Sequence, residues 1–172
     1  MDRYATTDEN ATGVFAFDLR TGALAHKYVL PERSPAHRFD DLTVAGNGRV
    51  FVSDGGSGIV YTIEPGGASL DVFVPAGTIQ GPNGLATTPD GKWLYVSDYA
   101  GYIFRVDTAT KAATRLEAPS DVALYGIDGL AWHKGTLIGV QNGVEPARVL
   151  RLDLSADGTR ISVLTGFNMR RR

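Results

Sequence analysis

The sequence contains no cysteine, and its charges nearly balance, with 17 Lys and Arg residues against 19 Asp and Glu residues. The absence of cysteine excludes disulfides, thiolate metal sites and cysteine nucleophiles. A formal net charge of −2 provides neither a basic face for nucleic acid nor a polybasic anchor for a membrane surface. No apolar run approaches the length of a membrane span, which predicts a soluble protein with no membrane partner. No phosphate-binding loop, Gly-x-Ser-x-Gly or His-Glu-x-x-His motif is present.

The first ten residues, MDRYATTDEN, lack the charged and then apolar pattern of a signal peptide. We expect residues 1–12 to form a polar leader and residues 13–172 to form a single domain. The localisation is left open between the cytoplasm and, if the natural N-terminus lies upstream, an exported protein.

Glycine is abundant, at 21 of 172 residues, and it punctuates a repeat of about 44 residues. The leucines at positions 42, 85 and 130 lie 43 and 45 residues apart, and each is followed by a glycine turn and a second strand. Third strands are predicted at 59–63, 102–106 and 149–152, and a weaker fourth strand closes each unit. Four short strands at this period are typical of the blades of a β-propeller. A β-sandwich with coincidental spacing is the alternative, but several landmarks keep one period.

The fold class is therefore predicted to be all-β, with about three and a half propeller blades of four antiparallel strands. We expect a partial blade at 13–34 and complete blades at 39–75, 81–118 and 125–165. An arc of this kind leaves sheet edges unpaired, which proteins tolerate poorly. We therefore expect either a piece of a longer protein or self-association of two chains through the open blade edges.

Polar residues recur at the point where each unit begins. Because the first strand of a blade lies nearest the propeller axis, Asp40, Asn83 and Asp128 are expected to approach one another at the mouth of the channel. The second strands end in a further set at the same rim, namely Asp54, Asp98 and Asn142. Oxygen ligands that converge in this way suit a hard divalent cation. The alternative is that the Asn-Gly and Asp-Gly pairs only form turns, which a repeat protein repeats whatever its function.

Two segments carry a family resemblance. Gly81-Pro82-Asn83-Gly84-Leu85, with the Pro-Asp-Gly turn and the strand that follow it, resembles a blade of the senescence-marker protein (regucalcin)/gluconolactonase family. Ile127-Asp128-Gly129-Leu130 resembles the next blade of that family. The resemblance implies a six-bladed propeller that hydrolyses sugar lactones with a divalent metal, which could be Ca²⁺, Mn²⁺, Mg²⁺ or Zn²⁺.

The resemblance also implies roles for single residues. Asn83 and Asp128 match the metal ligands of the family, and Asp128 matches its proton acceptor. Arg38 matches a substrate-binding arginine, whereas Asp40 stands where the family has a substrate-binding asparagine, which makes the mouth more acidic. The remaining family ligand is a glutamate from a blade that this chain does not show, and Glu9 in the leader is a poor substitute.

Two functions are carried forward. The first is a metal-dependent sugar-lactone (cyclic ester) hydrolase that acts on a small lactone or sugar acid derivative. The second is a non-enzymatic propeller that binds a small molecule or a protein on its rim. The weaker candidates for the site are Asp41, Asp54, Asp98, Asn142 and His133, the last being a histidine that follows an innermost strand.

Overall fold

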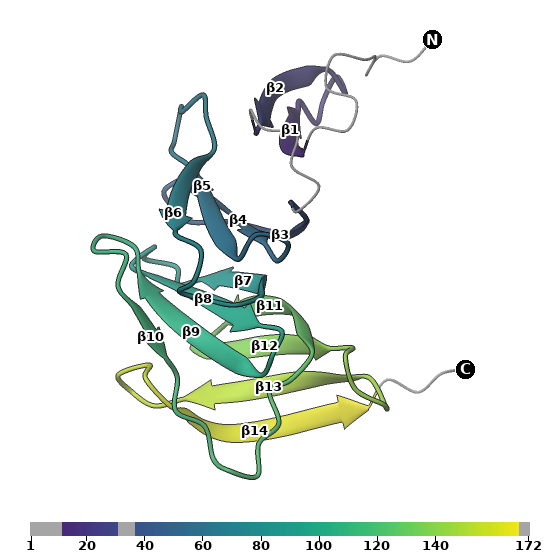
Figure 1. Cartoon of the computed structure of the whole chain (residues 1–172), viewed down its shortest axis with the longest axis vertical. Coiled ribbons are helices and arrows are strands. Elements are labelled where there is room, and N and C mark those ends of the chain that lie inside the picture. Colours follow the sequence, from purple (N-terminus) through teal and green to yellow (C-terminus); the bar gives the residue numbers. More distant parts are fainter. Residues whose placement is uncertain (1–11, 31–36, 169–172) are drawn as a thin grey trace.

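The computed structural model describes residues 12–30 and 37–168, and every secondary-structure element among these residues is a β-strand (Figure 1). They form one two-stranded and three four-stranded antiparallel sheets. The predicted all-β, partial-propeller fold is confirmed. The predicted leader lies outside the described residues except for Thr12, as does Glu9. None of the described segments is an apolar helix of membrane-spanning length.

Each sheet is a meander, in which consecutive strands pair with one another. The N-terminal half-blade consists of β1 (Gly13–Phe17) and β2 (Leu24–Val29). The first blade consists of β3 (Phe39–Val44), β4 (Val50–Asp54), β5 (Ile59–Ile63) and β6 (Asp71–Val74). The second blade consists of β7 (Pro82–Thr87), β8 (Trp93–Asp98), β9 (Tyr102–Asp107) and β10 (Ala113–Arg115). The third blade consists of β11 (Ile127–His133), β12 (Thr136–Gln141), β13 (Arg148–Leu154) and β14 (Ile161–Asn168).

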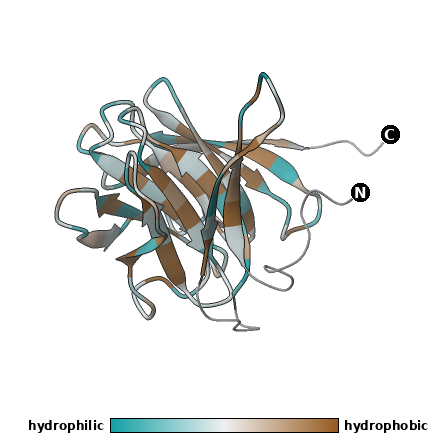
Figure 2. Ribbon diagram, turned by 90° about the horizontal axis from the view of Figure 1, so that it is seen from above, coloured by the Kyte–Doolittle hydropathy of each residue, from teal (hydrophilic) through white to brown (hydrophobic). Residues whose placement is uncertain are grey.

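The sheets follow one another along an arc (Figure 1). The first strand of each complete blade lies on the concave side, where β7 contacts both β3 and β11. Hydrophobic residues gather on the strands and hydrophilic residues in the connecting loops (Figure 2). Residues near the starts of β3, β7 and β11 therefore lie close together, at one mouth of the channel.

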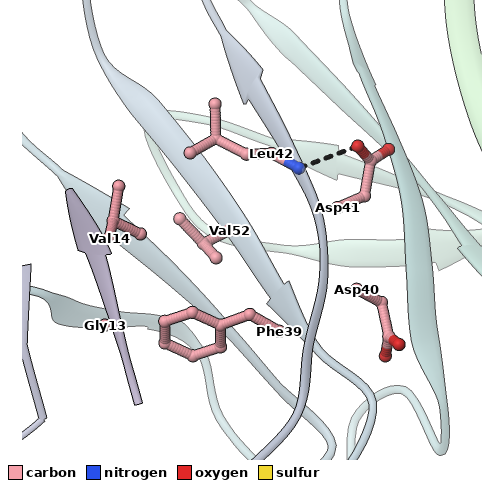
Figure 3. Close-up of a pocket in the computed structure, with 7 residues that line it drawn as sticks. All are labelled: Gly13, Val14, Phe39, Asp40, Asp41, Leu42 and Val52. Carbon is pink, nitrogen blue, oxygen red and sulfur yellow. Dashed lines mark hydrogen bonds between the residues drawn. The ribbon is translucent and has the colours of Figure 1, made fainter. Parts of the chain in front are cut away.

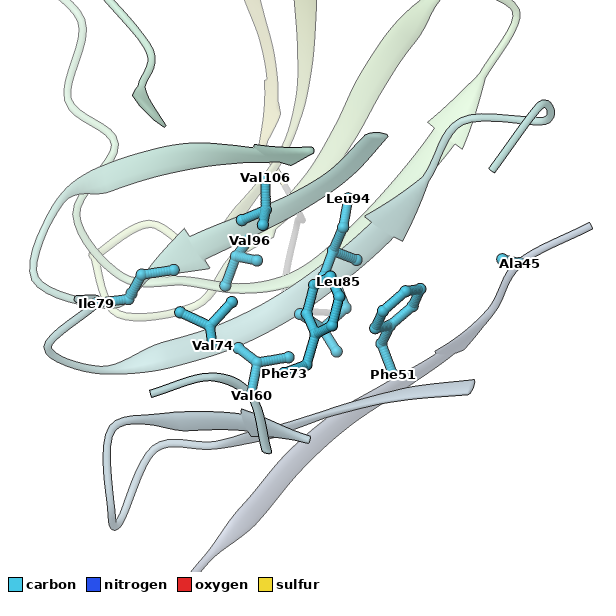
Figure 4. Close-up of a cluster of buried hydrophobic side chains, with 10 residues drawn as sticks. All are labelled: Ala45, Phe51, Val60, Phe73, Val74, Ile79, Leu85, Leu94, Val96 and Val106. Atoms are coloured by element: carbon cyan, nitrogen blue, oxygen red, sulfur yellow. The ribbon is translucent and has the colours of Figure 1, made fainter. Parts of the chain in front are cut away.

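Apolar side chains fill the space between neighbouring blades. Between the first and second blades, Phe51 meets Phe73 edge to face at 4.8 Å between ring centroids, and Leu94 and Val96 pack against them from β8 (Figure 4). A second cluster joins the second and third blades and includes Tyr95 and Leu137. Because the second strands of the first and second blades are covered on both faces, β4 and β8 are apolar on both faces rather than alternating with polar residues.

The innermost strands approach one another closely. A Cβ atom at Gly84 would lie 2.6 Å from the carbonyl carbon of Gly129 in β11, so only glycine allows β7 and β11 to pack at this distance. Asn83-Gly84 and Asp128-Gly129 lie within β7 and β11, so the alternative that these pairs form turns is wrong. Their glycines serve the contact between blades.

The third blade has a different register from the one that the sequence spacing predicts. Asp54 pairs with Phe39 and Asp98 with Pro82, but the equivalent partner of Ile127 is Gln141 and not Asn142. The cause is the turn before β12, which has two residues, Lys134 and Gly135, both with positive φ, as a two-residue type I′ hairpin turn requires. The prediction that Asn142 shares the position of Asp54 and Asp98 is therefore wrong by one residue.

Candidate functional site

The mouth of the arc contains a cavity of about 340 Å³ to which all three complete blades contribute. It brings together most of the site residues expected from the sequence. Its lining residues are Arg38, Asp40, Gly81, Asn83, Tyr99, Asp128 and Asn142.

Three of these side chains, Asp40, Asn83 and Asp128, form what we call the axial row, and each lies at a β-bulge. The register between first and second strand shifts between Phe39 and Leu42, between Pro82 and Leu85, and between Ile127 and Gly129. An extra residue in one strand turns a side chain out of the regular alternation, and bulges are frequent beside active sites for this reason. The bulges explain how the same position in three blades presents a polar side chain to one cavity.

Serine side chains from the second strands support two of the bulges. The backbone N–H of Asp41 donates to Ser53 Oγ at 3.0 Å. Ser97 Oγ, fully buried, donates to the carbonyl oxygen of Ile127 at 3.0 Å and so connects the second and third blades. Neither serine was predicted as a site residue from the sequence, although each precedes the recurring aspartate of its strand.

Asn83 has an unused hydrogen-bonding atom. Its side chain is only 6% exposed, and its Oδ1 is buried without a hydrogen-bond partner. Such an oxygen normally has a partner, because its desolvation costs about 1–3 kcal/mol when none is present. The amide oxygen of Asn83 therefore has unused hydrogen-bonding capacity, in a residue that lines the cavity.

Asp128 lies in the same cavity and is exposed. Asn142 Nδ2 donates to its Oδ2 at 2.7 Å, which fixes one carboxylate oxygen and leaves the other for a ligand or a proton. Because Gln141 pairs with Ile127, Asn142 is the first residue after β12 and reaches Asp128. Tyr99, the first residue after β8 of the second blade, also lines the cavity.

Arg38 and Asp40 form an ion pair at the edge of the cavity. Arg38 Nε donates to Asp40 Oδ1 at 2.9 Å, and the backbone N–H of Gly55 donates to Asp40 Oδ2 at 3.0 Å. The hydrogen bond to Asp40 raises the pKa of the Arg38 guanidinium further above its ordinary value. Arg38 is 67% exposed along its side chain, whereas Asp40 is 15% exposed, so the arginine can turn toward a ligand.

A second set of polar side chains, Asp54, Asp98 and Gln141, lies behind the axial row, and we call it the anchor row. Asp54 is fully buried and accepts hydrogen bonds from the backbone N–H groups of Arg38 and Ser57 and from His37 Nδ1 at 2.6 Å. Burial raises the pKa of Asp54, but these hydrogen bonds outweigh burial and hold the pKa below its ordinary value. These hydrogen bonds hold the segments before β3 and after β4 in place, and they leave the Asp54 carboxylate little capacity to bind a ligand.

The other two members of the anchor row have the same role. Asp98 accepts from the backbone N–H of Ala100, and Gln141 Nε2 donates to the carbonyl oxygen of Tyr125 at 2.6 Å. Gln141 is fully buried and also accepts from Arg148 Nε. The structure thus places the weaker candidates Asp54 and Asp98 outside the cavity.

Asp41 connects two blades rather than facing the cavity. Its Oδ2 accepts from the backbone N–H of Leu85 at 2.8 Å, and its Oδ1 accepts from that of Leu42 (Figure 3). Burial raises the pKa of Asp41, and the nearby carboxylates of Asp128 and Asp40 add to the rise while the two backbone donors oppose it. His133 lies at the opposite end of β11 from Asp128, which places it away from the cavity.

Comparison with known proteins relates this arrangement to one family. Residues 6–135 match the SMP-30/gluconolactonase/LRE-like region. No curated protein matches the chain in sequence. Among solved structures, the calcium-binding protein regucalcin from Agrobacterium tumefaciens is 22% identical, with a TM-score of 0.66 over 87% of this chain and 52% of that one.

Two other solved structures show the same fold at lower identity. Virginiamycin B lyase from Staphylococcus aureus is 17% identical, with a TM-score of 0.64 over 94% of this chain and 50% of that one. Hydrazine synthase from Kuenenia stuttgartiensis is 18% identical, with a TM-score of 0.69 over 91% of this chain and 43% of that one. The chain thus spans about half the length of the structures it matches. Since the family match covers most of its length, the chain belongs to the SMP-30/gluconolactonase/LRE-like family.

Proposed function

We propose that this chain provides the metal-binding side of a sugar-lactone hydrolase of gluconolactonase type. The observation that carries the proposal is the buried, unpartnered Oδ1 of Asn83 in the same cavity as the Asp128 carboxylate. Membership of the family supports it, as does the likeness to a regucalcin described as calcium-binding.

The oxygen atoms in the cavity suit a hard divalent cation. Asn83 Oδ1 and the Asp128 carboxylate would hold it, and both are ligand types that Ca²⁺, Mg²⁺ and Mn²⁺ prefer. Among residues 12–30 and 37–168, no three His, Asp or Glu side chains gather into a metal-ligating group, so the amide of Asn83 is an essential part of the set. When bound, the cation would polarise an ester carbonyl and acidify a water molecule.

The residues of the chain supply the remaining chemistry. Asp128 accepts the proton of the attacking water at the carboxylate oxygen that Asn142 leaves free. Arg38 donates hydrogen bonds to oxygen atoms of the lactone at the rim, and Asp40 accepts from its hydroxyl groups. Water attacks the ester carbonyl carbon and gives a proton to Asp128, the ring C–O bond breaks, and Asp128 returns this proton to the ring oxygen to give the hydroxy acid.

A lactone panel tests the proposal. We expect the protein to hydrolyse at least one five- or six-membered sugar lactone with Ca²⁺, Mn²⁺, Mg²⁺ or Zn²⁺, and to lose this turnover with EDTA. Asp128→Asn should abolish the metal-dependent turnover. Unchanged turnover in Asp128→Asn would remove Asp128 from the mechanism.

Binding without hydrolysis is the second candidate function. It is favoured by the finding that, within the described residues, no three His, Asp or Glu side chains gather into a group that could hold a metal ion. In that case lactones or sugar acids bind and stabilise the protein, and no lactone in the panel is turned over with any of the four cations.

A further inference from the structure

A second cavity, of about 350 Å³, lies between the second and third blades. Trp93 at the start of β8 and Trp132 near the end of β11 line it. Asn83 and Asp128 lie at the other end of these sheets, near the starts of β7 and β11. Since β7 and β8 are antiparallel, this cavity lies at the end of the blades opposite the mouth. We call it the tryptophan cavity, and its walls include the side chains of Trp93, Tyr95, Arg105 and Trp132.

Three aromatic rings form walls of the tryptophan cavity. Tyr95 and Trp132 stack across the junction between the blades, with ring centroids 5.7 Å apart and an interplanar angle of 20°. Tyr95 is buried, whereas Trp93 and Trp132 are only partly buried although both pack against the core between the blades. Indole rings that stay partly uncovered beside a cavity offer a flat apolar surface on which another ring can pack.

Arg105 contributes a charged group with an unused donor to the same cavity. Its guanidinium carbon lies 3.9 Å from the centroid of the Trp93 ring, and its Nη1 donates to the carbonyl oxygen of Asp157 in the turn between β13 and β14. Its Nε is buried and has no hydrogen-bond partner among the described residues. Because a buried donor without an acceptor costs free energy, this N–H is hydrogen-bonding capacity that a ligand can use.

The junction between the first and second blades has an arginine in the same place, and that arginine is fully paired. Counted back from the aspartates that end β4 and β8, Arg49 stands in the first blade where Trp93 stands in the second. Arg49 donates from Nε to Glu64 and from Nη1 to the carbonyl oxygen of Thr108, in the turn between β9 and β10. Arg105 likewise reaches the last turn of the following blade, but its Nε meets no carboxylate in the described structure. The second junction thus keeps the cation and lacks the anion that pairs with it in the first.

The charges around the tryptophan cavity favour an anionic ligand. Lys92 Nζ lies 5.2 Å from the centroid of the Trp93 ring, on which the Arg105 guanidinium also stacks. Of the described residues that line the cavity, Asp157 alone is acidic. Its Oδ1 accepts from Ser155 Oγ at 2.6 Å, and hydrogen bonds within this turn lower its pKa to about 2. Two cations and one carboxylate therefore stand at the cavity, which leaves one positive charge for a ligand.

We propose that the tryptophan cavity is a second ligand site and that it binds a small carboxylate with an apolar ring. The ring packs against the partly uncovered indoles of Trp93 and Trp132. One carboxylate oxygen accepts a charge-assisted hydrogen bond from Arg105 Nε and so takes the place that Glu64 has in the first junction. The site lies at the other end of the blades from Asn83 and Asp128, and its ligand is independent of the lactone.

Tryptophan fluorescence reports on this cavity alone, because Trp93 and Trp132 are the two tryptophans of the chain and both line it. Cyclohexanecarboxylate is the probe, since it has the ring and the charge and does not absorb the exciting light. We expect it to change the emission in a saturable way. Cyclohexanecarboxamide has the ring without the charge, and acetate has the charge without the ring. Each should bind more weakly by about 10-fold or more, since each lacks one of the two contacts.

A substitution at Arg105 tests the role of its donor. Arg105→Met keeps an unbranched side chain and removes the guanidinium, so the dissociation constant of cyclohexanecarboxylate should rise by about 10-fold or more. Arg115→Met is the matched control, because Arg115 also lies 3.9 Å from an aromatic ring centroid, that of Tyr102, but does not line the cavity. It should leave binding unchanged. Far-UV circular dichroism should show the wild-type sheet content in both variants.

The wild-type comparison of carboxylate with carboxamide tests the same contact without any substitution, so the proposal stays testable if Arg105→Met does not fold. Four results would overturn the proposal. They are the absence of a saturable emission change with cyclohexanecarboxylate, equally tight binding of the carboxamide, equally tight binding of acetate, and wild-type affinity in folded Arg105→Met. The titrations are made with EDTA and without lactone, so their outcome is independent of the proposed hydrolase activity.

Discussion

The axial row and the anchor row lie at the same mouth, contain similar side chains and differ in how their polar atoms are used. Asp54 in the anchor row is fully buried and accepts hydrogen bonds from four neighbouring residues. Asn83 in the axial row is almost as buried, yet its Oδ1 has no partner. Side chains of similar type and burial thus differ in hydrogen-bonding capacity, which is used in Asp54 and unused in Asn83.

The largest expected effect on stability concerns the anchor row. Asp54→Ala leaves part-buried donors of Arg38, Ser57 and His37 unsatisfied, and we expect it to lower the free energy of unfolding by about 3 kcal/mol. Denaturant unfolding measures this value. Asp153→Ala, which removes an ion pair with a half-exposed Arg151, is the control and should change stability by less than about 1 kcal/mol. A loss of equal size in both variants would show that Asp54 is not an anchor.

The next effect concerns catalysis. Asp128→Asn keeps the shape of an exposed side chain, so we expect stability to change by less than about 1 kcal/mol. The metal-dependent kcat/KM for the best lactone should fall at least 100-fold, which corresponds to about 2.7 kcal/mol of transition-state stabilisation. If Asp128→Asn instead lost as much free energy of unfolding as Asp54→Ala, the axial row and the anchor row would not differ in role.

A smaller effect is expected at the residue that positions Asp128. Asn142→Ala removes the 2.7 Å hydrogen bond to Asp128 Oδ2, and we expect kcat to fall about 10-fold while KM stays unchanged. Steady-state kinetics separate the two constants. Asn47→Ala, in an exposed turn outside the cavity, should leave both constants unchanged. A rise in KM alone would assign Asn142 to substrate binding.

The smallest effect concerns pH. Because hydrogen bonds hold the pKa of Asp54 below its ordinary value, its charge stabilises the fold above the ordinary carboxyl pKa. This contribution is lost as pH falls through the lowered pKa, so the stability gap between wild type and Asp54→Asn should narrow on acidification. Thermal unfolding from pH 7 to pH 3 measures this stability gap, and a gap that widens on acidification would contradict the predicted direction of the pH dependence.

The repeat made most of the fold predictable from the sequence. The strand at 59–63 was predicted with its observed limits, because glycine turns and β-branched residues mark both ends. The cavity residues Asn83 and Asp128 were also predicted, since each lies two residues before the recurring leucine of its blade. The register of the third blade was not predictable from spacing, because a two-residue turn at Lys134-Gly135 shifts every later position by one.

The role of Gly84 and the hydrogen bonds of Asp54 and Asp98 could not be predicted from the sequence. Asn83-Gly84 has the composition of a turn, and only the packing of β11 against β7 shows why Gly84 lies within a strand. Asp54 and Asp98 have the same residue type as the site residues. Their role as anchors depends on donors in loops that a linear spacing does not reveal.

Metal-dependent thermal unfolding of the wild type and Asn83→Leu tests the central claim most directly. In the wild type, a cation at 100 times its dissociation constant should stabilise the fold by about 2.7 kcal/mol and raise Tm by about 5–10 °C. Asn83→Leu should lose this shift, while its metal-free stability stays equal or rises, since a buried unpartnered amide has been removed. An equal shift in both proteins, or no shift in the wild type with Ca²⁺, Mn²⁺, Mg²⁺ and Zn²⁺, would contradict the account.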